Sequence, residues 1–264
     1  MASNSTKPHP WFEICHSRPS AKYQVFIFPG AGVPGFYYNN WDKDFPEYEF
    51  SLVIYPGRAK RLGEKCLTTI EEYLTQLDQE LLPYITKPCI FIGHSIGTMI
   101  SFAFARHIIE TTNKGDLIKL ILAMGRGAPH AADIVLEGDQ SYVEQTDEEL
   151  VQDLKRSADP NTVEIYDYQP FVDMVLPMYR ADAKIGNVSV SSTPINTPII
   201  VYEGEKDEGL NVESLNRWLE LTTNKDLFRV RLFPGHHNFQ SECQNQVLQC
   251  MKEDFNNVLN NSKV

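Results

Sequence analysis

The feature that most restricts how this chain can fold is a short apolar run that turns abruptly into a helix-like stretch. It reads CIFIGHSIGTMISFAFA and begins at Cys89. Gly93 and Gly97 flank Ser95. Small residues are needed at both positions where a strand turns so tightly into a helix that the serine is held outward at strained backbone angles. A tight turn without chemistry would need the same glycines. The strand-like run before the motif and the helical stretch after it favour Ser95 as a nucleophile.

Apolar runs rich in β-forming residues recur along the first half of the chain and alternate with helical stretches. After the second run, apolar residues follow helical spacing, and Thr69 with Glu72 fits a capping box at the start of that helix. Strands alternating with helices predict a parallel sheet covered by helices, which is the α/β class. The runs predict strands at Tyr23–Phe28, Phe50–Tyr55, Cys89–Ile92 and Leu117–Met124.

The alternation stops between about Arg126 and Asn196, where the pattern is helical. Strand-like runs then resume at Pro198–Gly204 and Leu227–Phe233. We therefore predict a single domain over residues 1–264 with a helical lid inserted at 126–196. Hydrophobic residues make up 42% of the chain, enough for one sizeable core. The residues before Tyr23 are expected to form a loose arm, pinned to the body by aromatic side chains.

A serine hydroxyl needs a base to take its proton, and the base needs a carboxylate to orient it. Of seven histidines, only the adjacent pair His236 and His237 follows a sheet strand closely enough to reach the top of the sheet. Asp207 comes just after another strand end, so the order is Ser95, Asp207 and then the histidine pair, as in α/β-hydrolases. Other acids of the same loop compete for this role: Glu203, Glu205 and Glu208.

Several stretches of the chain resemble the type II thioesterases, α/β-hydrolases that serve nonribosomal peptide and polyketide synthases. The same family includes the medium-chain fatty acyl thioesterases. YPGRAKRLGE is similar to the family's YPGRxxRxxE stretch, and GHSIG is similar to its serine elbow. FIFPGAG resembles its first-strand loop, LPMYRADAK its lid stretch and GEKD its aspartate loop. FPGHHNF resembles FPGGHFF, which aligns His237 with the catalytic histidine and His236 with a glycine.

This resemblance implies the remaining parts of the site. It assigns Ser95, Asp207 and His237 to a catalytic triad and the backbone N–H groups of Ala31 and Ile96 to the oxyanion hole. It also implies a substrate acyl group carried on the phosphopantetheine arm of an acyl or peptidyl carrier protein. The role would be editing, which is the removal of stalled or wrong acyl groups. No cofactor or metal is expected for the enzyme itself.

Charge and cysteine usage limit the partners and the compartment. The formal net charge of −11 disfavours binding to nucleic acid or to an anionic membrane. Five cysteines without a CxxC pair indicate reduced thiols in a cytoplasmic protein, which we expect to be a monomer. Lys60 and Lys65 belong to a local basic cluster with Arg58 and Arg61, which either docks an acidic carrier protein or forms ion pairs within the chain.

Two other functions are compatible with the same residues. A general carboxylesterase would use the same triad, although the chain has no HGGG-type oxyanion loop. A non-catalytic binding protein of the same fold would not need a complete set of triad residues in order. A medium-chain fatty acyl-carrier thioesterase is the alternative within the family.

Overall fold

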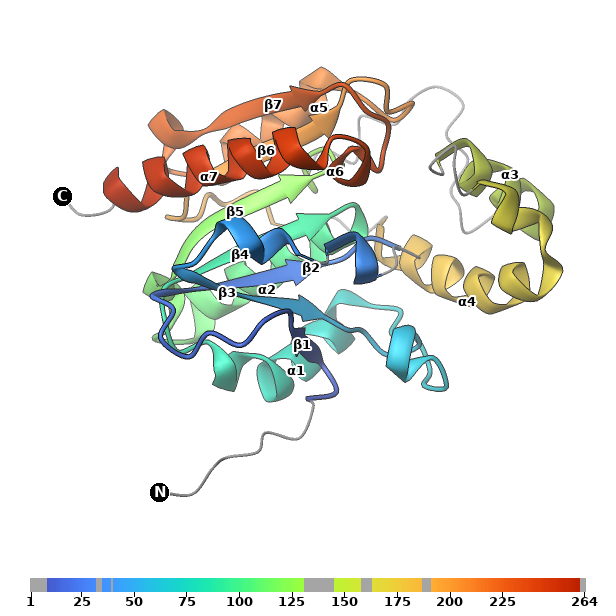
Figure 1. Cartoon of the computed structure of the whole chain (residues 1–264), viewed down its shortest axis with the longest axis horizontal. Helices are drawn as coiled ribbons and strands as arrows, with labels where there is room; N and C mark the ends of the chain where they lie inside the picture. The colour runs from blue at the N-terminus through green and yellow to red at the C-terminus, as the bar shows by residue number, and fades with distance from the viewer. Residues whose placement is uncertain are drawn as a thin grey trace.

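The computed structural model of the chain describes residues 9–31, 35–38, 40–130, 145–157, 163–186 and 191–261. A seven-stranded sheet runs through the molecule in the order β1-β3-β2-β4-β5-β6-β7 (Figure 1). Its six strands from β2 to β7 are parallel, and β1 is antiparallel to β3. The prediction of a mostly parallel sheet covered by helices is confirmed. The strands are β1 (Phe12–Ile14), β2 (Tyr23–Phe28), β3 (Tyr48–Val53), β4 (Cys89–His94), β5 (Ile118–Met124), β6 (Ile199–Gly204) and β7 (Arg229–Phe233).

Helices cover both faces of this sheet. The α-helices of the described residues are α1 (Ile70–Glu80), α2 (Ile96–Thr111), α3 (Asp147–Ser157), α4 (Gln169–Gly186), α5 (Val212–Asn216), α6 (Phe239–Glu242) and α7 (Gln244–Asn261), of which α3 and α4 lie beyond the strand ends. Side chains alternate across each strand, and β4 illustrates the result. Phe91 packs in one core with α1, α2 and α5, whereas Ile90 and Ile92 pack in a second core with α7. The sheet is therefore buried on both faces, as parallel sheets are.

The described part of the N-terminal arm, from His9 onward, is more ordered than the sequence indicates. Residues Phe12–Ile14 add β1 to the sheet edge, pairing Phe12 with Val53. Trp11 is 2% exposed, and the Arg61 guanidinium lies over its ring, 4.4 Å from the centroid. Without β1, β3 would be the edge strand, and its unpaired backbone groups would be open to an extended segment. A three-residue strand has too little pattern of its own to be predicted.

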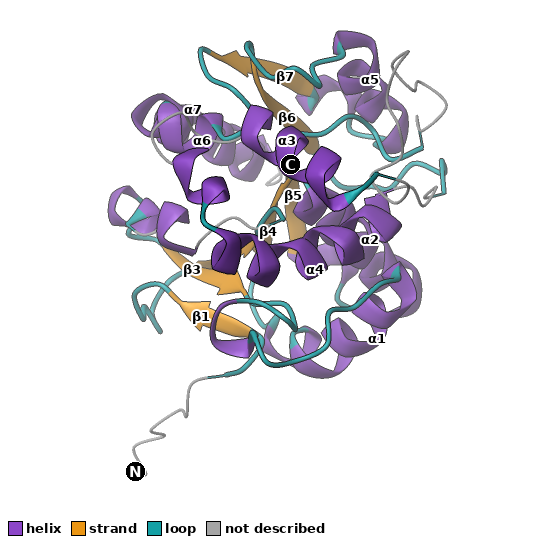
Figure 2. Ribbon diagram, turned by 90° about the vertical axis from the view of Figure 1, so that its right-hand side faces the viewer, coloured by secondary structure: helices purple, strands orange, loops and turns teal. Residues whose placement is uncertain are grey.

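The described elements between β5 and β6 are α3, α4 and one short 3-10 helix, Val163–Asp167. Figures 1 and 2 show α3 and α4 beyond the carboxyl ends of the parallel strands. They have a small apolar cluster of their own, formed by Leu150, Val172 and Leu176. The boundaries 126 and 196 of the lid remain a prediction, since residues 131–144, 158–162 and 187–190 lie outside the described residues.

Two broader properties follow from the described part of the chain. None of its helices has both the length and the apolar character needed to cross a membrane. Within the same residues, no group of three or more His, Cys, Asp or Glu side chains is arranged to hold a metal ion.

Candidate active site

Ser95 lies in a strained turn between β4 and α2. Its backbone has φ 53° and ψ −122°, a conformation that side-chain-bearing residues rarely adopt. Both flanking glycines are required by close packing. A Cβ on Gly93 would lie 2.4 Å from Thr98 Cα, and a Cβ on Gly97 would lie 2.0 Å from the Phe28 carbonyl oxygen. The turn is further fixed because Ser95 N–H donates to the Met124 carbonyl at 2.8 Å.

The contact at Gly97 also brings the loop after β2 against the serine turn. Because β2 and β4 are parallel neighbours, with Phe28 opposite Gly93, both loops leave the same edge of the sheet. Ala31 lies in the first of these loops. Ile96 is the first residue of α2, and the first N–H groups of a helix have no acceptor within it. The two predicted oxyanion donors thus belong to two segments that pack against each other next to Ser95.

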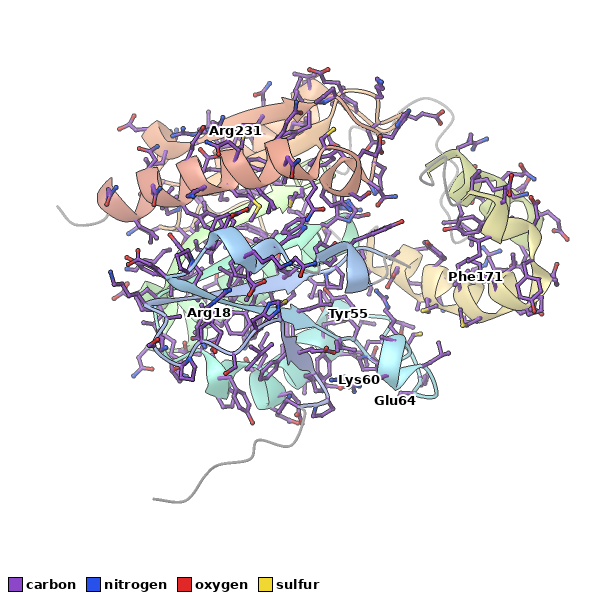
Figure 3. All side chains as sticks on the ribbon, in the orientation of Figure 1. Arg18, Tyr55, Lys60, Glu64, Phe171 and Arg231 are labelled. Carbon is purple, nitrogen blue, oxygen red and sulfur yellow. The ribbon has the colours of Figure 1, made fainter. Side chains whose placement is uncertain are left out.

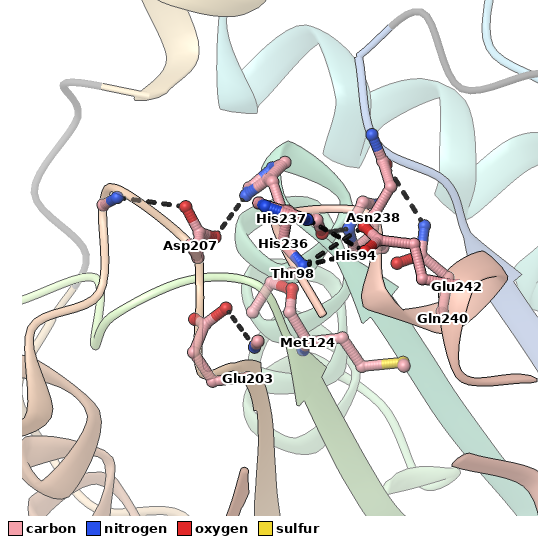
Figure 4. A network of polar contacts seen from close by, with 12 residues as sticks. His94, Thr98, Met124, Glu203, Asp207, His236, His237, Asn238, Gln240 and Glu242 are labelled. Carbon is pink, nitrogen blue, oxygen red and sulfur yellow. Dashed lines mark hydrogen bonds and ion pairs between the residues drawn. The ribbon is translucent and has the colours of Figure 1, made fainter. Parts of the chain in front are cut away.

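Asp207 and His237 meet at this same edge, in the loops that follow β6 and β7. The His237 Nδ1 atom lies 2.6 Å from Asp207 Oδ2 (Figure 4). The two loops are also joined through the backbone, since Lys206 N–H donates to the Gly235 carbonyl at 2.9 Å. A Cβ on Gly204 would lie 2.3 Å from the His236 carbonyl oxygen, so only glycine permits this approach.

Electrostatics prepares this pair for proton transfer. Burial alone would lower the pKa of His237, but the hydrogen bond to Asp207 and the charge of Asp207 outweigh it and raise the pKa above the ordinary 6.5. Burial alone would raise the pKa of Asp207, but the hydrogen bond and charge of His237 outweigh it and lower the pKa below 3.8. An ionised Asp207 would hold the imidazole with Nδ1 protonated and Nε2 available as a base.

The adjacent His236 points elsewhere. Its Nδ1 lies 2.9 Å from Glu242 Oε2, and its side chain is 41% exposed. Its backbone N–H donates to the same carboxylate. His236 is not among the residues with positive φ, so the position that resembles a glycine needs no glycine geometry here. The structure therefore brings one histidine of the pair to Asp207 and turns the other to the surface.

The competing acids of the loop after β6 have other surroundings. Glu205 and Glu208 are exposed. Glu203 is 3% exposed and accepts a hydrogen bond from Gly204 N–H at 2.9 Å. Among the four acids of this loop, all of them described, Asp207 is the one whose carboxylate contacts an imidazole.

His94, the residue before the serine, has a contact that sequence reasoning missed. Its ring is fully buried, and its Nε2 lies 3.0 Å from the His237 carbonyl oxygen. A carbonyl can only accept, so His94 Nε2 carries a proton and donates. Burial lowers the pKa of His94 to about 3, which keeps the ring neutral. His94 thereby ties the serine turn to the His237 loop. No local pattern signals this contact, because it joins positions 143 residues apart.

The predicted basic cluster divides into two buried and two exposed side chains. Arg61 forms an ion pair with Glu64, and Arg58 forms one with Asp182 of α4. Lys60 and Lys65 are exposed. Lys60 belongs to the segment that follows β3 (Figure 3). Its Nζ lies 3.0 Å from the His9 carbonyl oxygen. The arginines thus have structural partners, and the lysines remain open to solvent.

Comparison with known proteins places these features in context. The thioesterase domain family matches residues 23–254 of the chain. Gramicidin S biosynthesis protein GrsT of Aneurinibacillus migulanus is 30% identical over 254 residues, which cover 94% of this chain and 95% of that protein. The human medium-chain S-acyl fatty acid synthase thioesterase is 22% identical over 253 residues, covering 91% of this chain and 92% of that protein.

A solved structure supports the fold. The type II thioesterase BorB from the borrelidin biosynthetic cluster superposes with a TM-score of 0.79. The match covers 95% of this chain and 99% of that one, at 24% sequence identity.

Proposed function

The chain belongs to the thioesterase domain family, and from that premise we propose that it hydrolyses acyl thioesters on the phosphopantetheine arm of carrier proteins, with Ser95, Asp207 and His237 as its catalytic triad. Thioester hydrolysis is the activity of the family. The proposal is supported most directly by the 2.6 Å contact between His237 and Asp207, at the same sheet edge as the glycine-flanked Ser95.

In the proposed mechanism, His237 Nε2 takes the proton of the Ser95 hydroxyl as the serine oxygen attacks the thioester carbonyl. His237 then gives that proton to the sulfur as the carbon–sulfur bond breaks, and the pantetheine thiol leaves. Water attacks the acyl-enzyme in the second half-reaction, with His237 again serving as base. Within the described residues, Ser95 Oγ makes no hydrogen bond to His237. Such bonds commonly tighten only when substrate is bound.

The negative charge that develops on the carbonyl oxygen would be stabilised by the N–H groups of Ile96 and Ala31. Each donor of this kind contributes roughly 3 kcal/mol to catalysis in well-studied hydrolases. The packing of the Phe28 carbonyl on Gly97 supports this assignment, because it holds the loop that carries Ala31 against the turn that carries Ser95.

The proposed biological role is editing in nonribosomal peptide or polyketide synthesis. It is favoured by the similarity to a gramicidin S biosynthesis protein and to a type II thioesterase of a borrelidin cluster. The exposed Lys60 and Lys65 would attract an acidic carrier protein. The proposal includes a cytoplasmic, monomeric enzyme without a cofactor; all five cysteines are free thiols, which fits a reducing compartment.

The substrate class is tested by presenting one acyl group in three forms: on a carrier protein, on free pantetheine and as a simple oxyester. Ser95→Ala supplies the background rate. We expect kcat/KM to be highest for the carrier-bound thioester. An oxyester turned over as efficiently as the carrier thioester would indicate a carboxylesterase and contradict the proposal.

A medium-chain fatty acyl-carrier thioesterase is the second candidate, favoured by the similarity to the human enzyme along most of both chains. A series of acyl-carrier substrates separates the two. An editing enzyme should accept short acyl groups, whereas sharply rising kcat/KM toward medium chains would support the fatty acyl alternative.

A further inference from the structure

Glu203 is a carboxylic acid at a position that the sheet reserves for apolar side chains. Alternate residues of β6 share a face, and Ile199 and Val201 of this face pack in the core with Trp218. Glu203 is next on the same face and is 3% exposed. A buried carboxyl group without a role would be costly. Glu203 is four residues before Asp207, so a role in the His237–Asp207 pair would explain this buried carboxyl group.

The hydrogen bonds of Glu203 lead toward the active site. One carboxyl oxygen, Oε1, accepts from Gly204 N–H at 2.9 Å (Figure 4). The neighbouring carboxyl group of Asp207 acts on Glu203 chiefly through its charge and, to a smaller extent, through hydrogen bonding between the two groups. The loop between them is a tight turn, in which Asp207 N–H donates to the Gly204 carbonyl. Two carboxyl groups can share such a bond only if one of them carries a proton.

The surroundings decide which carboxyl group holds the proton. Asp207 faces the His237 imidazole, whose hydrogen bond and charge keep the pKa of Asp207 low despite burial. Burial, followed by the charge of Asp207, raises the pKa of Glu203 to about 8. The titratable groups acting on Glu203 are Asp207 and His237, and Arg126, beyond β5, acts in turn on His237. At neutral pH Glu203 is therefore the protonated partner.

We propose that Glu203 is a positioning residue of the active site: its neutral carboxyl group donates a hydrogen bond to the Asp207 carboxylate and holds Asp207 in the orientation that meets His237 Nδ1. The inference rests on the triad proposed above. It extends the contact between His237 and Asp207 by one member, Glu203. Above the titration range of Glu203 the proton is lost, the bond disappears and the two carboxylates repel each other.

The test compares Glu203→Gln with Glu203→Leu on an acyl-pantetheine substrate over pH 5 to 9.5. The Gln amide can donate to Asp207 and accept from Gly204 N–H, whereas Leu can do neither. At pH 7 we expect Gln to retain most of the rate and Leu to lose about tenfold, equivalent to ~1.4 kcal/mol. In the parent, kcat/KM should fall through an alkaline transition near pH 8. The Gln variant should lack this transition.

The pH dependence of thermal unfolding reports whether Glu203 is protonated in the folded state. Because the folded state keeps the Glu203 proton up to about pH 8 whereas an unfolded glutamate releases it near 4.5, the parent loses stability as pH rises between these values. The Gln variant has no such loss, so its Tm advantage over the parent should widen from pH 5 to pH 8.

The outcomes separate the two proposals. Identical alkaline limbs in the parent and Glu203→Gln, or a Gln variant as slow as the Leu variant, would overturn the role of Glu203. If Ser95→Ala retained activity, the triad itself would fail instead, whatever the Glu203 variants do.

Discussion

The sheet edge and the helices beyond it are held in place by different kinds of contact. At the edge, backbone hydrogen bonds and glycine-only approaches fix the loops that carry Ser95, Asp207 and His237. Helices α3 and α4 instead have their own small apolar cluster. Helix α4 is joined to the body by Ile185, which lies near its end and packs in the main core, and by the buried ion pair between Arg58 and Asp182.

That ion pair is incompletely satisfied. Arg58 Nε and Nη1 and Asp182 Oδ2 are buried without a described hydrogen-bond partner. A buried pair of this kind contributes little net stability but is costly to break from one side. Backbone contacts therefore fix the loops that carry Ser95, Asp207 and His237. Side-chain contacts hold α3 and α4, which we expect to be freer to move.

The largest expected effect comes from removing Ser95, the proposed nucleophile, at the sheet edge. Ser95→Ala should lower the rate of thioester hydrolysis on the order of 10⁶-fold, the loss seen when a triad nucleophile is removed. The fold should persist, because a half-buried serine hydroxyl contributes little packing. Steady-state rates and circular dichroism on one preparation test both statements. A tenth of the parental activity in this variant would refute the assignment.

The adjacent histidines give the next largest effect and carry an internal control. His237→Ala should lower kcat roughly 10³-fold or more, because it removes the proposed base. His236→Gly should stay within about tenfold, or ~1.4 kcal/mol of barrier, because His236 contacts Glu242 at the surface. Both are measured on the same substrate. The reverse ranking would move the base to His236.

Asp182→Ala tests the attachment of the covering helices α3 and α4. It leaves the Arg58 guanidinium buried and unpaired, at a cost of roughly 3–5 kcal/mol. Hydrogen exchange should already be faster in α3 and α4 than in β4 and β5 of the parent, and the variant should widen that gap. The double variant Arg58→Met/Asp182→Leu, which removes both charges, should narrow it again. Equal acceleration in the central strands would argue against a separately moving cover.

The pH dependence tests the electrostatics of the sheet edge. His237 must be neutral to act as base, and its pKa is raised by Asp207. Activity should therefore fall toward acid pH with a midpoint above 6.5, by about tenfold for each pH unit below it. A kcat/KM profile recorded with acyl-pantetheine measures this midpoint. A midpoint below 6.5 would mean that Asp207 does not raise the basicity of His237.

The smallest expected effect concerns partner docking. Reversing both Lys60 and Lys65 to Glu should raise KM several-fold for an acyl-carrier substrate and spare acyl-pantetheine, because only the carrier presents an acidic surface. The effect should shrink with added salt. Lys252→Glu, on the exposed side of α7, is the matched charge control. Equal effects on both substrates would assign these lysines a structural role.

Local patterns predicted the elements well. Tyr23–Phe28 is β2 with the expected bounds, and the Thr69–Glu72 capping box begins α1, because both depend on neighbouring residues. The strand β1 could not be predicted, since the edge of β3 induces it. The run expected at Phe50–Tyr55 is shifted to Tyr48–Val53, where pairing with β2 sets the register.

The site divides in the same way. The strand, turn and helix around Ser95 are local, so the pattern predicts its geometry. The sequence patterns place the candidate acid in the loop after β6 and the candidate base in the loop after β7. Contacts between distant segments then distinguish Asp207 from Glu203 and His237 from His236. The bond from His94 to the His237 carbonyl depends wholly on how distant segments pack, and no spacing rule reaches it.

The strained backbone at Ser95 has a consequence for the descent of such proteins. Its φ of 53° and ψ of −122° suit glycine far better than serine, at a cost of order 1–3 kcal/mol. A copy released from selection for catalysis would gain stability by a single change to glycine here. Glycine in place of the serine would therefore mark, within a genome, a duplicate that kept the architecture after its chemistry was abandoned.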